Sequence, residues 1–141
     1  MADQLADRQA IVDLTIAYSY ALDDRRFDDL DDVFVPDATA ELGWLLEGRD
    51  AIKDRIRNAL VPLDASHHLV ATHQVRFDGD RATGRCYLQA QHVRVDADGG
   101  PLFMVGGRYE DRYVRSPDGW RIEHRALVVL WTDGNAAVLG I

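Results

Sequence analysis

The hydrophobic pattern of this chain changes once, near residue 65, and that change most constrains how it can fold. Before it, apolar residues recur every three or four positions, as in a helix with one buried face. After it, apolar and polar residues alternate as in strands, over residues 66–75, 81–95, 102–115 and 119–131. Turn-forming residues separate these segments, so each strand should run antiparallel to the next. Helices followed by four long strands predict an α+β fold.

Two helices are predicted at the start of the chain. The first covers residues 4–22, whose apolar residues share one face, and Asp3 or Asp7 should cap it. The second follows almost without a linker and should end at Pro36. Its buried face is formed by Phe27, Leu30, Val33 and Phe34.

A short strand and a third helix should complete this first half of the chain. The strand is expected over residues 38–44. The helix should begin at residues 48–50, with Asp50 as its cap, and Pro62 should stop it.

Composition and charge narrow the class of protein. Of 141 residues, 47% are hydrophobic and 28% charged, which fits one globular domain over residues 1–141. The formal net charge of −8 argues against nucleic acid and anionic membranes as partners. The single cysteine, Cys86, cannot form an internal disulfide, and no stretch resembles a signal peptide or membrane span. A cytoplasmic location is therefore expected.

The predicted strands have one inward face. In the strand over residues 82–94 this face carries small and apolar residues, with His92 as its polar end. In the next strand it carries Phe103, Val105, Gly107, Tyr109, Asp111 and Tyr113. Small inward residues leave volume, which either helix side chains or a ligand could fill. Both interpretations stay open at this point.

Alternation fails in the last strand, because residues 127–131 are all apolar. This predicts burial on both faces, either by the fold or by a partner subunit. We therefore expect a homo-oligomer, a trimer or a dimer. Residues 136–141 are either further subunit contacts or a cover for the pocket.

Three of the five histidines fall within residues 66–75. Imidazole is the side chain best suited to moving protons near neutral pH. Adjacent residues on a strand diverge, and no two histidines have the spacing of a metal site. His67 and His73 should therefore face away from His68 or lie at an interface. For His68 the alternative is a structural histidine in the core.

Four motifs occur in order along the chain. They are Leu5-Ala6-Asp7-Arg8-Gln9-Ala10-Ile11-Val12-Asp13-Leu14; Tyr18-x4-Asp23 with Phe27-Asp28-x-Leu30; His68-Leu69-Val70-Ala71-Thr72; and Gly106-Gly107-x-Tyr109-x-Asp111-x-Tyr113 before Gly119-Trp120-Arg121-Ile122. With the order of elements, they resemble the nuclear transport factor 2-like fold. This is a cone-shaped α+β barrel with N-terminal helices in the concave face of a curved, mainly antiparallel sheet. Residues 5–131 most resemble its SnoaL-like branch, which includes scytalone dehydratase, bile-acid dehydratase and hexachlorocyclohexane dehydrochlorinase.

The resemblance implies a set of catalytic residues. In that branch an aspartate at a helix corner pairs with a histidine on the first long strand, and Asp23 and His68 match these positions. Scytalone dehydratase has a second histidine eight residues after a glycine on the next strand, and Gly84 and His92 match that spacing. Bile-acid dehydratase has a tyrosine five residues before its aspartate, and Tyr18 matches that position. The structural alternatives are a helix cap for Asp23, an exposed strand end for His92 and core packing for Tyr18.

The chain departs from the family pattern at two places. Leu22 stands where scytalone dehydratase has a tyrosine, and the last strand lacks the arginine that related enzymes have at the positions of Leu127 and Val129. Arg125 lies on the same side of that strand and is expected to substitute. The remaining expected substrate contacts are Trp44, Tyr109, Leu88, Phe103 and Trp131. Asp111 should be structural, whereas His124 and Arg125 are equally compatible with pocket and surface.

A carboxylate beside a histidine stabilises the imidazolium that forms when the histidine takes a proton. The expected function is therefore a dehydratase-like lyase acting on a small hydrophobic or cyclic substrate, without a metal or organic cofactor. His68 would remove a proton from carbon, and His92 or Tyr18 would protonate the leaving oxygen. An isomerase or polyketide-type cyclase is one alternative, and a non-catalytic small-molecule-binding module is another.

Overall fold

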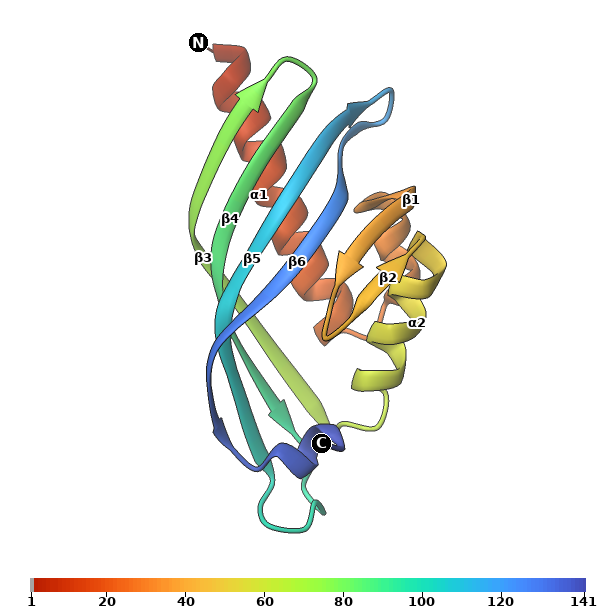
Figure 1. The fold of residues 1–141 in the computed structure, drawn as a ribbon, viewed down its shortest axis with the longest axis vertical. Helices are drawn as coiled ribbons and strands as arrows, with labels where there is room; N and C mark the ends of the chain where they lie inside the picture. Colours follow the sequence, from red (N-terminus) through yellow and green to blue (C-terminus); the bar gives the residue numbers. More distant parts are fainter. Residues whose placement is uncertain (1) are drawn as a thin grey trace.

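The computed structural model describes residues 2–141, with side chains from residue 4 onward, and shows a curved six-stranded sheet with helices on its concave face (Figure 1). The helices are α1 (Ala2–Asp23), η1 (Phe27–Asp32), α2 (Arg49–Leu60) and η2 (Ala136–Leu139). The strands are β1 (Phe34–Glu41), β2 (Leu45–Glu47), β3 (Ala65–Asp78), β4 (Arg81–Val93), β5 (Leu102–Ser116) and β6 (Gly119–Gly134). Their order is β2-β1-β6-β5-β4-β3, and only β1 and β6 pair in parallel. The predicted α+β fold is confirmed.

The predicted second helix is shorter than expected and of a different type. It is the 3-10 helix η1, and Phe34 starts β1 instead of lying on a helical face. Pro36 explains this, because the residue before a proline is pushed out of the helical region. Phe34 pairs with Ile122 of β6, and the β1–β6 register shifts between Phe34 and Thr39, where the proline lies.

Of the expected helix caps, Asp7 and Asp50 are wrong. Asp3 lies outside the described side chains, and Asp7 lies within α1. Asp7 accepts hydrogen bonds from Arg115 Nη2 at 2.6 Å and from Trp120 Nε1 at 3.1 Å, which ties α1 to β5 and β6. In α2 the capping position is Gly48, and Asp50 lies in the first turn.

The inward faces of β4 and β5 are the ones that alternation predicted. Ala82, Cys86, Leu88, Ala90 and His92 are buried on β4. The small residues serve two purposes. A Cβ at Gly84 would lie 3.1 Å from the Tyr113 ring, so this space is already filled. Ala90 lines an open cavity instead.

A β-bulge changes the direction of side chains along β3. Ala71 and Gln74 pair with Tyr87 and Arg85, so β3 has one residue more than β4 in this stretch. Thr72 lies in the bulge and has a left-handed backbone, with a φ of 61°. The bulge brings His73 inward, with its Nε2 2.8 Å from Thr15 Oγ1. The prediction that His73 lies on the face opposite to His68 is therefore wrong, whereas His67 is exposed on the outer face as expected.

A buried ion pair fills the middle of the cone. Arg125 Nε and Nη2 donate to the carboxylate of Asp111 at 2.8 and 2.9 Å, and Tyr113 donates its hydroxyl to the same group at 2.8 Å. The Arg125 guanidinium lies 4.3 Å from the ring centre of Tyr18 and 3.8 Å from that of Tyr109. Asp111 is therefore structural, as predicted.

The apolar end of β6 is not buried on both faces by this chain. Val129, Leu130 and Trp131 are each about half exposed. Trp131 covers Gly106 on the face of β5 opposite to Phe103 and Val105, since a Cβ at Gly106 would lie 2.0 Å from its ring. That a partner subunit covers this surface stays a prediction. None of the helices within residues 2–141 combines the length and apolar character needed to cross a membrane.

Arg125→Met should lower the free energy of unfolding by about 3–5 kcal/mol, because it leaves the Asp111 carboxylate buried without its cation. Denaturant unfolding measures this loss. Arg81→Gln is the matched control, since it breaks an exposed pair with Glu123 and should cost much less. Equal losses in the two variants would contradict the structural role of the buried pair.

Candidate active site

A largely apolar cavity of about 400 Å³ lies between the sheet and α2, at the end of the cone where α1 ends (Figure 1). Leu139 and Ile141 line it, so the C-terminal segment forms part of its wall. Six of the residues predicted as catalytic or substrate-binding also line it: Tyr18, His68, Leu88, His92, Phe103 and Tyr109. A volume of this size is within the range of small-molecule sites.

Asp23 and His68 form a hydrogen-bonded pair at this cavity. Asp23 is the last residue of α1, and His68 lies near the start of β3. His68 Nδ1 lies 2.6 Å from Asp23 Oδ1, and the backbone N–H of His68 donates to Oδ2 at 2.8 Å. Since the carboxylate can only accept, the Nδ1 atom carries the proton. In the neutral ring this leaves a lone pair on Nε2, which is what a general base requires.

The surroundings of Asp23 favour its charged form. Partial burial by itself would raise the pKa of the Asp23 carboxyl, but hydrogen bonds from His68 and Ser66 and the charge of His68 together lower it. The Ser66 hydroxyl donates to Asp23 Oδ1 at 2.9 Å. Asp23 therefore remains a carboxylate near neutral pH and can stabilise a protonated imidazole. It is not the cap of η1, because Arg26 occupies that position.

Arg25 extends this network by an unusual backbone conformation. Its φ of 59° is left-handed, and glycine usually occupies such a position after a helix. The N–H groups of Arg25 and Arg26 bond Leu22 O at 3.2 Å and Ala21 O at 2.9 Å, which is the Schellman ending of α1. The side chain turns back so that Arg25 Nη1 donates to Leu22 O at 2.7 Å and to Ser66 Oγ at 2.8 Å.

His92 is buried and faces His68. Their ring centres are 5.8 Å apart, and the rings are nearly perpendicular. Desolvation is the main reason that the pKa of His92 is lowered; the positive charges of His68 and Arg25 add to it, against a hydrogen bond to Phe103 O and the charge of Asp23. His92 Nδ1 donates to Phe103 O at 3.0 Å, so the neutral ring presents a lone pair at Nε2. It is therefore not an exposed strand end.

Tyr18 and Tyr109 form the wall of the cavity next to the buried ion pair. Their ring centres are 5.6 Å apart, edge to face, and both rings contact the Arg125 guanidinium. Burial raises the pKa of both phenols above the usual value, although the Arg125 charge opposes this shift. Near neutral pH both hydroxyls keep their protons and can donate to a ligand oxygen.

Three of the predicted substrate contacts do not line the cavity. Arg125 lies behind the two tyrosines and is fully buried, Trp131 covers Gly106, and Trp44 is 58% exposed. His124 lies on the other face of the sheet, where its Nδ1 is 2.6 Å from Thr39 Oγ1 and the ring lines a polar surface groove.

Among the lining residues that the sequence analysis did not name, Arg55 of α2 is the one with a permanently charged side chain. It stacks on Trp44, with its guanidinium 4.3 Å from the ring centre. No periodic signal marks it, because an arginine between apolar helix positions normally points to solvent. Among the described residues, no three His, Cys, Asp or Glu side chains are grouped so that they could hold a metal ion.

A curved sheet around an entry helix, with a histidine–aspartate pair at an apolar cavity, defines a small α+β domain of the cone-shaped class. The sequence profile of the SnoaL-like domain matches residues 3–126, and this chain belongs to that family. An uncharacterized protein of Mycobacterium tuberculosis is 38% identical over 125 residues, which cover 86% of this chain and 84% of that protein. The terrestric acid biosynthesis cluster protein E of Penicillium crustosum is 29% identical, over 96% of this chain and 91% of its own.

Solved structures agree with this assignment. The Kfla4162 protein of Kribbella flavida matches with a TM-score of 0.91 and 26% identity, over 98% of this chain and 99% of that chain. A Novosphingobium aromaticivorans protein, a candidate scytalone dehydratase by name, matches with a TM-score of 0.85 and 25% identity, over 96% and 92%. A hexachlorocyclohexane dehydrochlorinase shares the fold, with a TM-score of 0.84 and 22% identity over 99% and 94%. The fold is thus shared with proteins named as a dehydratase and a dehydrochlorinase.

Lowering the pH from 7 to 5 should reduce the free energy of unfolding. The pKa values of His92 and His73 are lowered in the folded chain, mainly by desolvation, so below about 6.5 the unfolded chain binds protons that the folded chain does not. This contribution is fully present above the ordinary histidine pKa and is lost as the pH falls through the folded value. Urea unfolding at both pH values measures the change. His92→Gln should reduce this change in the free energy of unfolding, and the exposed His67→Gln should not. The same pH dependence in His92→Gln as in the unmodified protein would contradict the lowered pKa of His92.

Arg25→Gly should raise the pKa of His92, because the charge of Arg25 helps to depress it. Its effect on stability should be small, since relief of about 1 kcal/mol of left-handed strain offsets the lost hydrogen bonds. Proton NMR titration of the His92 ring measures the shift. Arg26→Ala, which removes the neighbouring cation paired with Asp29, should leave the titration unchanged. The same titration midpoint of His92 in Arg25→Gly and in the unmodified protein would rule out an effect of the Arg25 charge on the pKa of His92.

Proposed function

We propose that this protein is a dehydratase-like lyase that works by general acid–base catalysis without a cofactor. One observation carries the proposal: the 2.6 Å contact between His68 Nδ1 and Asp23 Oδ1 at the wall of an apolar cavity. A carboxylate-oriented imidazole in a desolvated site is suited to taking a proton from carbon. The relationship to proteins named as scytalone dehydratase and dehydrochlorinase supports elimination as the reaction class.

The proposed reaction begins with His68 Nε2, which removes a proton from the carbon next to a carbonyl group. The electron pair of that C–H bond forms a carbon–carbon double bond, and the neighbouring C–O bond breaks. The departing oxygen takes a proton from Tyr18 and leaves as water. The His68 imidazolium then returns a proton to the Tyr18 phenolate through solvent, which restores the starting state.

Tyr18 suits the role of acid better than His92 does. The pKa of Tyr18 is raised, so the phenol is protonated near neutral pH, and a departing hydroxide is a much stronger base than a phenolate. The pKa of His92 is lowered, and its Nδ1 proton already bonds Phe103 O. His92 Nε2 would instead accept a hydrogen bond from the substrate hydroxyl and hold it in place.

Isomerisation is the second candidate, and the pair of neutral phenols favours it. Tyr18 and Tyr109 both line the cavity and could donate to one enolate oxygen. In that reaction His68 would return the proton to a different carbon, and no water would be lost.

The test uses a panel of cyclic β-hydroxy ketones incubated with the protein in D2O. Mass spectrometry should detect loss of one water from a substrate, whereas isomerisation gives deuterium exchange without that loss. His68→Ala and Asp23→Asn should each slow turnover by about 10²–10⁴-fold, because the base or its orienting partner is removed. His67→Ala is the matched control, since His67 is exposed on the outer face of the same strand and should keep full activity.

Circular dichroism shows whether each variant stays folded. Full activity in folded His68→Ala, or neither water loss nor deuterium exchange with any member of the panel, would count against the proposal.

A further inference from the structure

The cavity contains an unbalanced positive charge. Among the described side chains that line it, Arg55 alone is permanently charged, and none belongs to an aspartate or a glutamate. Asp23 is not among the lining residues. The remaining wall is mostly apolar, so a cation here is not needed for packing and costs desolvation. The proposed elimination does not use this residue either.

Arg55 is held in place before any ligand arrives. Its Nε donates to Leu42 O at 3.0 Å, and its guanidinium stacks on Trp44. Gly43, between these two residues, has a φ of 95°, and a Cβ there would lie 3.4 Å from Arg55 Nη2. Leu42 and Gly43 also line the cavity. The guanidinium is therefore fixed along the β1–β2 turn at the cavity wall, which lowers the entropy cost of using it for binding.

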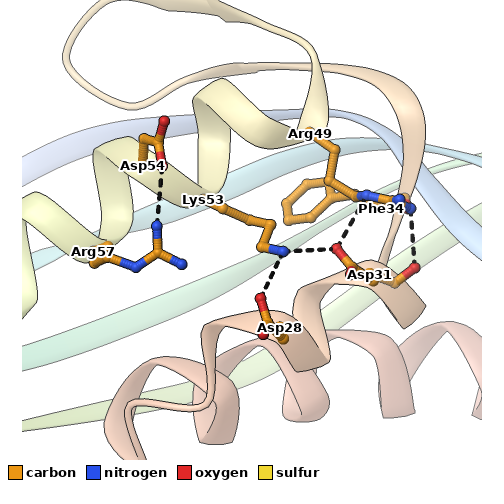
Figure 2. Close-up of polar contacts among 7 residues, drawn as sticks. All are labelled: Asp28, Asp31, Phe34, Arg49, Lys53, Asp54 and Arg57. Atoms are coloured by element: carbon orange, nitrogen blue, oxygen red, sulfur yellow. Dashed lines mark hydrogen bonds and ion pairs between the residues drawn. The ribbon is translucent and has the colours of Figure 1, made fainter.

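The helix that carries Arg55 is itself anchored. Figure 2 shows Lys53 of α2 between Asp28 and Asp31 of η1, at 2.9 and 3.0 Å. Arg49 donates to Asp31 O at 3.2 Å and to Phe34 O at 3.1 Å. These contacts attach the outer side of α2 to η1 and β1. The position of Arg55 relative to the cavity is therefore set by the fold and not by a mobile element.

The free edge of Arg55 suits an anion. Within the described part of the chain, no hydrogen bond uses Arg55 Nη1 or Nη2. A guanidinium offers these atoms as parallel donors to the two oxygens of a carboxylate. The protein as a whole carries a net charge of −8, which repels anions, so an acidic ligand would need a local cation to enter.

We infer that Arg55 binds a carboxylate of the substrate, and that the substrate class is a small apolar ring system bearing one carboxylate. The inference deepens the proposed function, on which it rests only in taking this cavity as the substrate site. Arg55 would then determine specificity and orientation, while His68 and Tyr18 perform the proton transfers.

A matched pair of ligands tests the charge directly. Calorimetry is performed with 2-naphthoate and 2-naphthamide, which share the ring system and differ in charge. The protein should bind the naphthoate about tenfold more tightly, as one charged hydrogen bond would give. The preference should shrink as the salt concentration rises. Arg55→Met and Arg55→Gln should bind both ligands equally, whereas Arg55→Lys should keep part of the preference.

Arg57→Gln is the control on the same helix. Figure 2 shows Arg57 directed toward Asp54, at 3.0 Å, and it does not line the cavity. This variant should keep the full preference. Equal binding of both ligands by the unmodified protein, no naphthoate binding at millimolar concentration, or a preference that survives in folded Arg55→Met would each overturn the inference. Binding needs no turnover, so a protein that prefers the naphthoate yet neither removes water from the panel substrates nor exchanges deuterium into them would contradict the proposed reaction alone.

Discussion

The ion pair between Arg125 and Asp111 marks the boundary between the packed part of the interior and the cavity. Its charges are buried, and they are stable there because Tyr113 donates to the carboxylate and two tyrosine rings cover the guanidinium. Tyr18 and Tyr109 contact Arg125 and also line the cavity. They therefore separate a packed half of the cone from a half that can hold a ligand.

The candidate site depends on a contact between the ends of two distant elements. Asp23 ends α1, and both of its carboxylate oxygens bond His68 near the start of β3. The backbone hydrogen bond places the strand and the imidazole bond sets the direction of the ring. Arg25 and Ser66 complete the corner, so one network ends the helix, positions the strand and orients the histidine.

Local patterns predicted α1, α2, the four long strands and the inward faces of β4 and β5, because helical periodicity and strand alternation depend only on neighbouring residues. The pairing of Asp23 with His68 came from a family resemblance, and the distance between them agrees with it. The errors at the candidate site arose where tertiary contacts decide the direction of a side chain. Parity put Arg125 on the inward side correctly, but could not reveal that Asp111 would hold it away from the cavity. Arg55 was missed because its direction depends on the β1–β2 turn, which no helical period reports.

The bulge at Thr72 affects which positions of β3 can be substituted during evolution. Its left-handed backbone, at a β-branched residue, costs on the order of 1–3 kcal/mol, yet it lets His68 and His73 both face inward although their positions differ in parity. Strand β3 thus consists of two stretches, and the alternation of inward and outward side chains shifts by one residue between them. Substitutions around His73, in the stretch after the bulge, can accumulate without changing the direction of His68. Ligand preference and core packing can therefore diverge independently within one strand.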